Sequence, residues 1–188
     1  MEAPAAGPLT LAEFEAELAA SEWKIELIDG YVYAFAGGTV AHDVLTLNIT
    51  RMLQNAVQPP SRVFSSNMPI QRADAPTYVF PDASVSCEPV EPGTNKLLEP
   101  ILAVEVISPE SVRRDRIDKL DAYQIIPSLA EYVMIDSRRI WACVYRRTAE
   151  AWSEHVFAPG GTLTLKSVAG FSLNIDRLYE GTGLPRFA

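Results

Sequence analysis

A single glutamate lies inside an apolar run, and it limits what this chain can fold into. Residues 101–107 read Ile-Leu-Ala-Val-Glu-Val-Ile, and Ser108 and Pro109 follow them directly. A short run rich in Val and Ile that ends at turn residues predicts a buried strand. Burying an ionised carboxylate without a partner is costly, so Glu105 must be paired, protonated or bound to a metal ion.

A second carboxylate can meet Glu105 if two predicted strands are neighbours. Residues 78–87 predict a strand that contains the step Pro81-Asp82. Side chains alternate between the two faces of a strand, so Glu105 lies opposite Val104 and Val106. With the strands side by side, Asp82 and Glu105 converge near one point. This arrangement suits Mg²⁺, which takes one or two carboxylates and keeps several water molecules.

A basic helix is predicted directly after the second strand, over residues 112–123. It can bring Lys119 over the point where the two carboxylates meet. It also carries Arg113, Arg114 and Arg116, which are candidates for phosphate contacts because arginine binds phosphate in a bidentate way.

These motifs, in this order and spacing, resemble the Uma-type restriction endonuclease family, a branch of the PD-(D/E)XK nuclease superfamily. The resemblance runs from about Glu22 to about Leu178. It implies an α/β (α+β mixed) fold with a restriction-endonuclease-like core, in which helices flank a mixed central sheet. It also implies a metal-dependent endonuclease that hydrolyses phosphodiester bonds of nucleic acid, with DNA as the expected substrate and Mg²⁺ or Mn²⁺ as the cofactor. The matching motifs are Pro81-Asp82, residues 104–106, residues 107–109, residues 114–116, Lys119-Leu120 and Tyr123.

The resemblance assigns roles to individual residues. Asp82, Glu105 and the backbone carbonyl of Val106 would hold the metal ion, and Lys119 would orient or help deprotonate a water molecule. Glu26 would lie near the metal site. The superfamily places a lysine two residues after the glutamate, but Ile107 stands there in this chain, so the role passes to Lys119.

Each assignment has a structural alternative. Glu105 could form an ion pair with an arginine in an inactive fold, and Lys119 could pair with Asp115 on a helix surface. Glu26 could be a solvated edge-strand carboxylate. His42 lies near the start of the helix predicted over residues 39–57. A single histidine there fits a capping position better than a catalytic one, although it could support the metal ligands without binding the ion itself.

The charge balance opposes a general nucleic-acid binder. The formal net charge is −8, whereas nucleic-acid affinity comes largely from neutralising phosphates. A second basic group lies on a later hairpin, and it could equally pair with acidic neighbours such as Asp136. The acidic balance favours an alternative function: a catalytically inactive binding or assembly module that acts as a homodimer joined through exposed strands. The second basic group consists of Arg138, Arg139, Arg146 and Arg147.

The rest of the chain predicts one domain over residues 10–188 after a flexible lead-in at residues 1–9. A capping-box pattern begins the first helix, and Asp29-Gly30 predicts a tight hairpin turn. Cys87 and Cys143 lie in apolar strand patterns, which favours buried free thiols over a disulfide. With no signal peptide and no membrane span in the pattern, we expect a cytoplasmic protein. The other predicted elements are helices at 10–18, 39–57 and 175–179, a hairpin at 23–35, and strands at 62–66, 68–71, 131–136, 140–145, 151–157 and 162–165.

Overall fold

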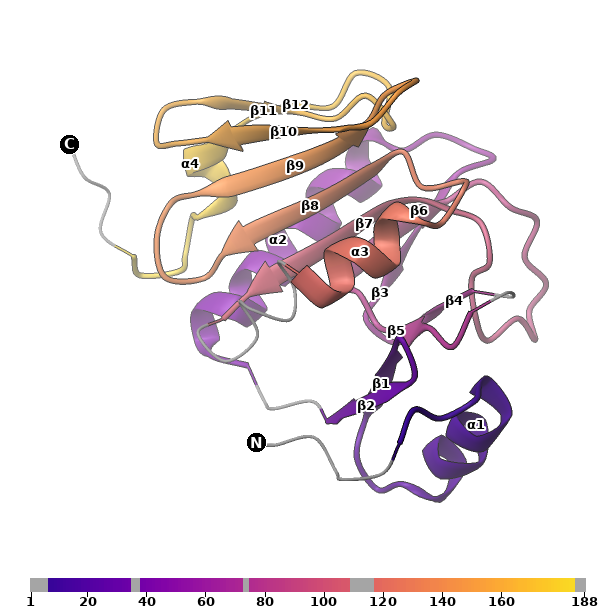
Figure 1. Cartoon of the computed structure of the whole chain (residues 1–188). Coiled ribbons are helices and arrows are strands. Elements are labelled where there is room, and N and C mark those ends of the chain that lie inside the picture. The colour runs from indigo at the N-terminus through magenta and orange to yellow at the C-terminus, as the bar shows by residue number, and fades with distance from the viewer. Residues whose placement is uncertain (1–6, 35–37, 73–74, 109–116, 185–188) are drawn as a thin grey trace.

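The computed structural model describes residues 7–34, 38–72, 75–108 and 117–184. A six-stranded mixed sheet with the order β10-β9-β8-β7-β6-β3 forms its larger part (Figure 1). β7 and β8 are parallel, and the other neighbouring strands of this sheet are antiparallel. The strands are β3 (Arg62–Ser65), β6 (Ala83–Ser86), β7 (Pro100–Ile107), β8 (Glu131–Asp136), β9 (Ala142–Arg147) and β10 (Trp152–Phe157).

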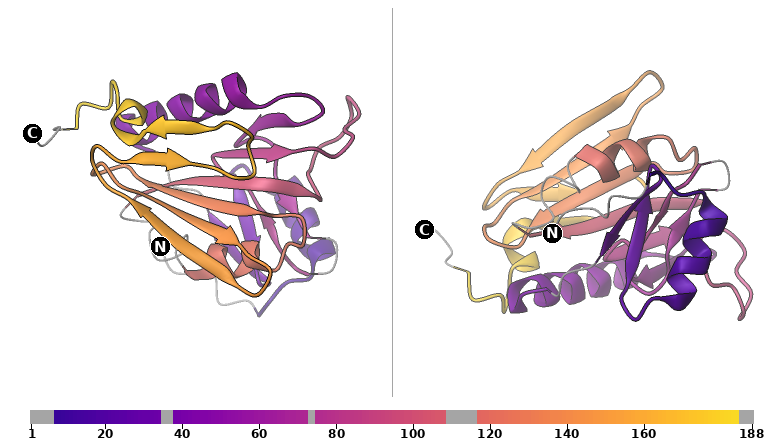
Figure 2. Two further views of the ribbon diagram at one scale, coloured as in Figure 1. Left: turned by 90° about the horizontal axis from the view of Figure 1, so that it is seen from above. Right: turned by 60° about the horizontal axis from the view of Figure 1, so that its bottom comes forward.

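Helices cover both faces of this sheet. α2 (Val40–Ala56) and α4 (Ile175–Leu178) lie on one side and α3 (Lys119–Gln124) on the other (Figure 2). Alternation along β7 explains the two layers: Val104 and Val106 pack in the core below α2, whereas Ala103 and Ile107 pack with Tyr123 of α3. The face predicted for Glu105 is therefore confirmed, because it points away from the two valines.

A smaller sheet, of order β2-β1-β5-β4, packs beside the large one and carries α1 (Leu11–Ala20). Its strands are β1 (Ile25–Ile28), β2 (Tyr31–Ala34), β4 (Ile70–Gln71) and β5 (Tyr78–Val79). The predicted turn is confirmed: Asp29 and Gly30 have φ of 50° and 82°, as a two-residue type I′ hairpin turn requires. The predicted capping box of Thr10 and Glu13 is also present.

The predicted strand over residues 78–87 is wrong as a single element. β5 belongs to the small sheet and β6 to the large one, and Pro81-Asp82 lies between them. Proline has no N–H to give to a sheet ladder, so it is rarely found in the middle of a central strand. The break places Asp82 at the junction of the two sheets.

Other differences follow from tertiary packing. α2, predicted as a helix over residues 39–57, carries two exposed apolar side chains, Val40 and Leu47, which are 77% and 62% exposed. Cys87 is exposed instead of buried, although both cysteines are free and Cys143 is buried. The sequence pattern missed β12 (Ser172–Asn174), which pairs with β11 (Thr162–Thr164). The first part of the predicted basic helix, residues 112–116, lies outside the described residues. None of the described helices combines the length and hydropathy that a membrane crossing requires.

Candidate active site

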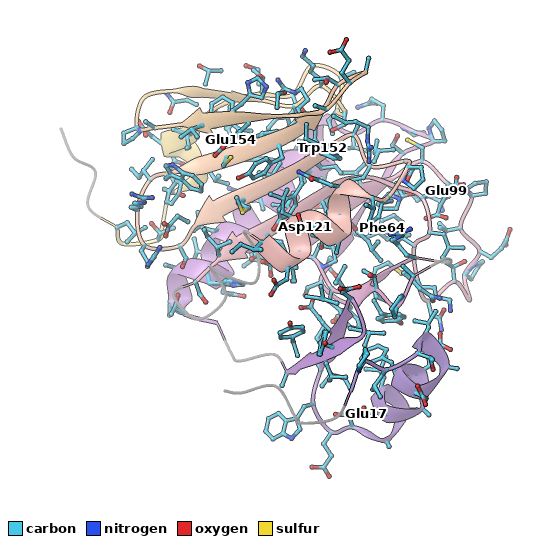
Figure 3. All side chains as sticks on the ribbon, viewed as in Figure 1. Glu17, Phe64, Glu99, Asp121, Trp152 and Glu154 are labelled. Atoms are coloured by element: carbon cyan, nitrogen blue, oxygen red, sulfur yellow. The ribbon has the colours of Figure 1, made fainter. Side chains whose placement is uncertain are left out.

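Glu105 meets its partners on α3. Its carboxylate is almost enclosed, and Oε1 accepts hydrogen bonds from Lys119 Nζ at 2.8 Å and from the Tyr123 hydroxyl at 2.9 Å. Lys119 and Tyr123 are four residues apart, so they lie on the same inward face of the helix. Asp121, labelled in Figure 3, lies on the exposed side of α3.

Lys119 joins Glu105 to a second buried glutamate. Its Nζ lies 3.0 Å from Oε1 of Glu26, and the two side chains are 1% and 0% exposed. The alternatives that placed Lys119 on a helix surface and Glu26 in solvent are therefore wrong. They failed because β1 pairs with β5 inside the small sheet, which encloses Glu26 beneath α3.

The two oxygens of Glu26 differ in their surroundings. Besides Lys119, Oε1 accepts a hydrogen bond from the backbone N–H of Phe80 at 2.7 Å. This bond fixes the chain one residue before Pro81-Asp82. Oε2 is buried and has no hydrogen-bond partner among the described residues. An unsatisfied buried carboxylate oxygen is costly, and such an atom calls for an explanation by function or by an unseen ion.

Asp82 is tied to the residue next to Glu105. Its Oδ2 accepts a hydrogen bond from the backbone N–H of Val106 at 2.7 Å and lies 3.4 Å from Nε2 of His42. Because Ala83 pairs with Val104 in antiparallel register, Asp82 comes level with Glu105.

The carbonyl of Val106 points to the same side of β7 as its own N–H, toward Asp82. The N–H and C=O of one strand residue point in one direction, and the N–H of Val106 points at Asp82. The next carbonyl, that of Ile107, points to the opposite side and accepts from Ser137. Asp82, Glu105 and the Val106 carbonyl are thus brought to one end of β6.

Lys24, which the sequence patterns did not single out, is electrostatically coupled to this cluster. Burial lowers the pKa of its ammonium below the ordinary value, while the nearby carboxylates of Glu26, Asp82 and Glu105 act to raise it. The positive charge of Lys119 adds to the lowering. Lys24 precedes Glu26 by two residues, so strand alternation places both on one face, and this spacing is the signal that could have identified it.

Tyr123 serves as a hydrogen-bond donor to Glu105. Burial is the main cause that raises the pKa of its phenol well above the ordinary value, and the negative charge of Glu105 adds to this effect. The hydroxyl therefore keeps its proton at neutral pH.

The predicted basic groups have different outcomes. Arg113, Arg114 and Arg116 lie outside the described residues, so their proposed phosphate contacts stay predictions. The second basic group, on the later hairpin, pairs with carboxylates and carbonyls of the same chain, as the alternative interpretation predicted. Arg138 and Arg139 bind Asp136 at 2.9 and 3.2 Å, Arg146 binds Glu131 at 2.7 Å, and Arg147 donates to the carbonyls of Gln124, Ile126 and Leu129.

The donor set limits the kind of metal ion that fits. Within the described part of the chain, no three His, Cys, Asp or Glu side chains form a group that could enclose a metal ion. The carboxylates of Asp82 and Glu105 and the carbonyl of Val106 are hard oxygen donors, and Mg²⁺ characteristically binds through few protein ligands and keeps several waters. The residues present fit Mg²⁺ or Mn²⁺ in this manner.

Comparison with known proteins agrees with the architecture. A family model described as "Uma2: Putative restriction endonuclease" matches residues 11–176. The chain belongs to this family. The predicted resemblance is therefore confirmed.

Relatives of this Uma2-family chain cover most of its length. Two uncharacterized proteins of Synechocystis sp., slr1290 and sll1609, are 30% and 33% identical over 161 and 133 residues. These alignments cover 84% and 68% of this chain, and 84% and 75% of the relatives. A crystal structure from Anabaena variabilis, titled a "putative nuclease", superposes with a TM-score of 0.77 at 21% identity, covering 92% of this chain and 98% of the other. This likeness confirms the predicted fold class.

Proposed function

We propose that this Uma2-family protein is a metal-dependent endonuclease that hydrolyses phosphodiester bonds of nucleic acid, with DNA as the substrate. One observation carries the proposal. The Lys119 ammonium lies between the buried carboxylates of Glu105 and Glu26, while Asp82 is fixed to the neighbouring Val106 N–H. Two buried carboxylates that share one amine, with Asp82 level with Glu105 on the neighbouring strand, form the only concentrated reactive chemistry that we find in the described residues.

Asp82, Glu105 and the Val106 carbonyl would hold Mg²⁺ or Mn²⁺. Once bound, the ion would supply Lewis-acid chemistry, activating a water molecule and offsetting negative charge on the scissile phosphate. Family membership supports this assignment, because the family description names a restriction endonuclease.

The chain's own groups would orient the water and manage its proton. Lys119, held between Glu105 and Glu26, would orient the attacking water. The unpartnered Oε2 of Glu26 would accept the proton that this water loses. A new P–O bond then forms, the P–O bond to the leaving strand breaks, and solvent protonates the leaving oxygen. Tyr123 would hold the Glu105 carboxylate in place throughout.

Two measurements test this proposal. Titrating Mn²⁺ into the metal-free protein should raise its melting temperature, and Asp82→Ala should abolish the rise. With Mn²⁺ present, the wild type should nick supercoiled DNA and Asp82→Ala should leave it intact. Absence of both effects in the wild type would contradict the proposal. Repeating the assay with single-stranded RNA shows whether the substrate is DNA or RNA.

The second candidate is an inactive assembly module that forms a homodimer. Its support is the net charge of −8 together with the internal pairing of the later arginines. Under this function the protein would elute as a dimer, show no metal-induced stabilisation and leave DNA intact. The two free cysteines agree with a reducing compartment, so under either proposed function we place the protein in the cytoplasm.

A further inference from the structure

Lys24 lies at the edge of the carboxylate cluster in a defined position. It directly precedes β1, and its ammonium contacts the carbonyl of Ser66 in the turn after β3. The same ammonium lies 4.4 Å from the centroid of the Phe80 ring. A cation over an aromatic face is held by the ring quadrupole, so the lysine head is positioned before any ligand arrives.

The two lysines of the cluster differ in exposure. Lys119 is 1% exposed and lies between two glutamates, where a group as large as a substrate phosphate does not reach it. Lys24 is only partly buried. Of the two, it is therefore the cation that an incoming substrate can contact.

Formal charges indicate what that substrate group would be. Glu26, Asp82 and Glu105 outnumber Lys119 by two negative charges, and a divalent cation would only neutralise this excess. Lys24 then leaves one positive charge in excess, which matches the single negative charge of a phosphodiester. Lysine is an established point-charge binder of phosphate, and a preorganised head loses less entropy on binding.

We propose that Lys24 is a substrate-contacting residue that binds a backbone phosphate beside the three carboxylates. This inference rests on the proposed nuclease function. It differs from the roles given to Lys119, which orients water and pairs with the glutamates from within the fold.

Salt dependence of binding provides the test. A labelled DNA duplex is titrated with protein at several salt concentrations, with Ca²⁺ in place of Mg²⁺ and gels confirming that the duplex stays intact. Each lost phosphate contact lowers the slope of log K against log salt by about one. We expect Lys24→Met to lower the slope by about one and Lys24→Arg to keep it.

Lys96 provides a matched control. It is partly buried and pairs with the exposed Glu15 at 3.1 Å, away from the cluster. Lys96→Met removes the same charge and should leave the slope unchanged. Lys24→Met should also retain the Mn²⁺-induced rise in melting temperature, which shows that the variant is folded and its metal site intact.

The possible failures are distinguishable. If the wild type cleaves DNA and Lys24→Met binds with an unchanged slope, the inference on Lys24 is overturned while the nuclease function stands. A lower melting temperature with an unchanged slope overturns the inference as well and marks Lys24 as a structural cation. If the wild type neither cleaves nor binds nucleic acid in a salt-dependent way, both proposals are overturned.

Discussion

Two buried glutamate sites in this molecule are built in opposite ways. Glu131 at the start of β8 is fully buried, and protein donors satisfy both of its oxygens. Oε1 accepts from Arg146 at 2.7 Å and from the Lys166 N–H at 3.1 Å. Oε2 accepts from the Ser167 N–H at 2.8 Å and from the Ser167 hydroxyl at 2.5 Å.

The cluster of Glu26 and Glu105 lacks this saturation. Two glutamates share the single ammonium of Lys119, and Oε2 of Glu26 has no hydrogen-bond partner in the described structure. A structural carboxylate is neutralised by the fold, whereas this cluster retains an excess of negative charge and one carboxylate oxygen that no described group satisfies. We therefore expect Glu131 to contribute mainly to stability and the cluster of Glu26 and Glu105 mainly to function. Variants at the two sites should then have opposite effects on unfolding free energy and cleavage rate.

The largest effect should come from Glu105→Gln. Removing this carboxylate charge should lower DNA cleavage by about a thousandfold, because stabilisation of developing charge depends on it. Stability should change little, since one repulsion between carboxylates is lost together with one ion pair. Cleavage rates in Mn²⁺ and melting curves check the two parts. A variant that loses stability but keeps its cleavage rate would contradict this prediction and show that Glu105, like Glu131, is a structural carboxylate.

Glu131→Gln should give the reverse result. Breaking a buried ion pair leaves Arg146 without its counter-charge, so we expect the free energy of unfolding to fall by about 3 kcal/mol. Cleavage per folded molecule should not change. Glu17→Gln, the same chemical change on the exposed side of α1 (Figure 3), serves as the control and should leave stability unchanged within error.

The same residue predicts a pH dependence. Burial alone would raise the pKa of Glu131, but hydrogen bonds from Ser167 and Arg146 outweigh it and lower the pKa below its ordinary 4.5. A lowered folded-state pKa gives stability that is present above the unfolded-state pKa and is lost as pH falls through the folded-state pKa. Unfolding free energies measured from pH 7 down to pH 3 should therefore decline below about 4.5 in the wild type. They should decline less in Glu131→Gln, and parallel curves would contradict the assignment.

Glu26→Gln should lower cleavage by about a hundredfold while leaving stability unchanged or slightly higher. The substitution removes one of the two carboxylate charges that share the Lys119 ammonium and keeps an acceptor for the Phe80 N–H. Rates and melting curves for this variant beside Glu131→Gln compare the two sites most directly. A loss of stability equal to that of Glu131→Gln would show that the two sites are alike.

The smallest effect should come from Tyr123→Phe. The change deletes one hydrogen bond to Glu105 and retains the ring packing on Tyr132, so it should reduce stability by about 1 kcal/mol. Cleavage should fall only modestly, because Lys119 still binds the same oxygen. Chemical denaturation and cleavage assays measure both effects, and complete loss of activity would indicate a direct role for the phenol.

Local patterns predicted much of this architecture. The bounds of β8 match the prediction, and the Asp29-Gly30 turn and the Thr10 capping box depend on neighbouring residues alone. The charge cost of a carboxylate in an apolar strand correctly indicated that Glu105 needs a partner. The order of the motifs along the chain identified the family.

Features that depend on distant contacts were not predictable in this way. Burial of Glu26 follows from the pairing of β1 with β5, and Glu131 receives its donors from Ser167 in a distant loop. The break at Pro81-Asp82 separates one apolar pattern into two sheets, which periodicity cannot show. Lys24 escaped prediction because its spacing to Glu26 becomes informative only once Glu26 is known to be buried in the cluster.

A Mn²⁺-soaked crystal tests the central claim most directly, because the anomalous signal locates the ion itself. We predict one strong anomalous peak at about 2.1 Å from carboxylate oxygens of both Asp82 and Glu105. No peak at this position under saturating Mn²⁺, or a peak bound only by other residues, would contradict a metal site shared by these two carboxylates.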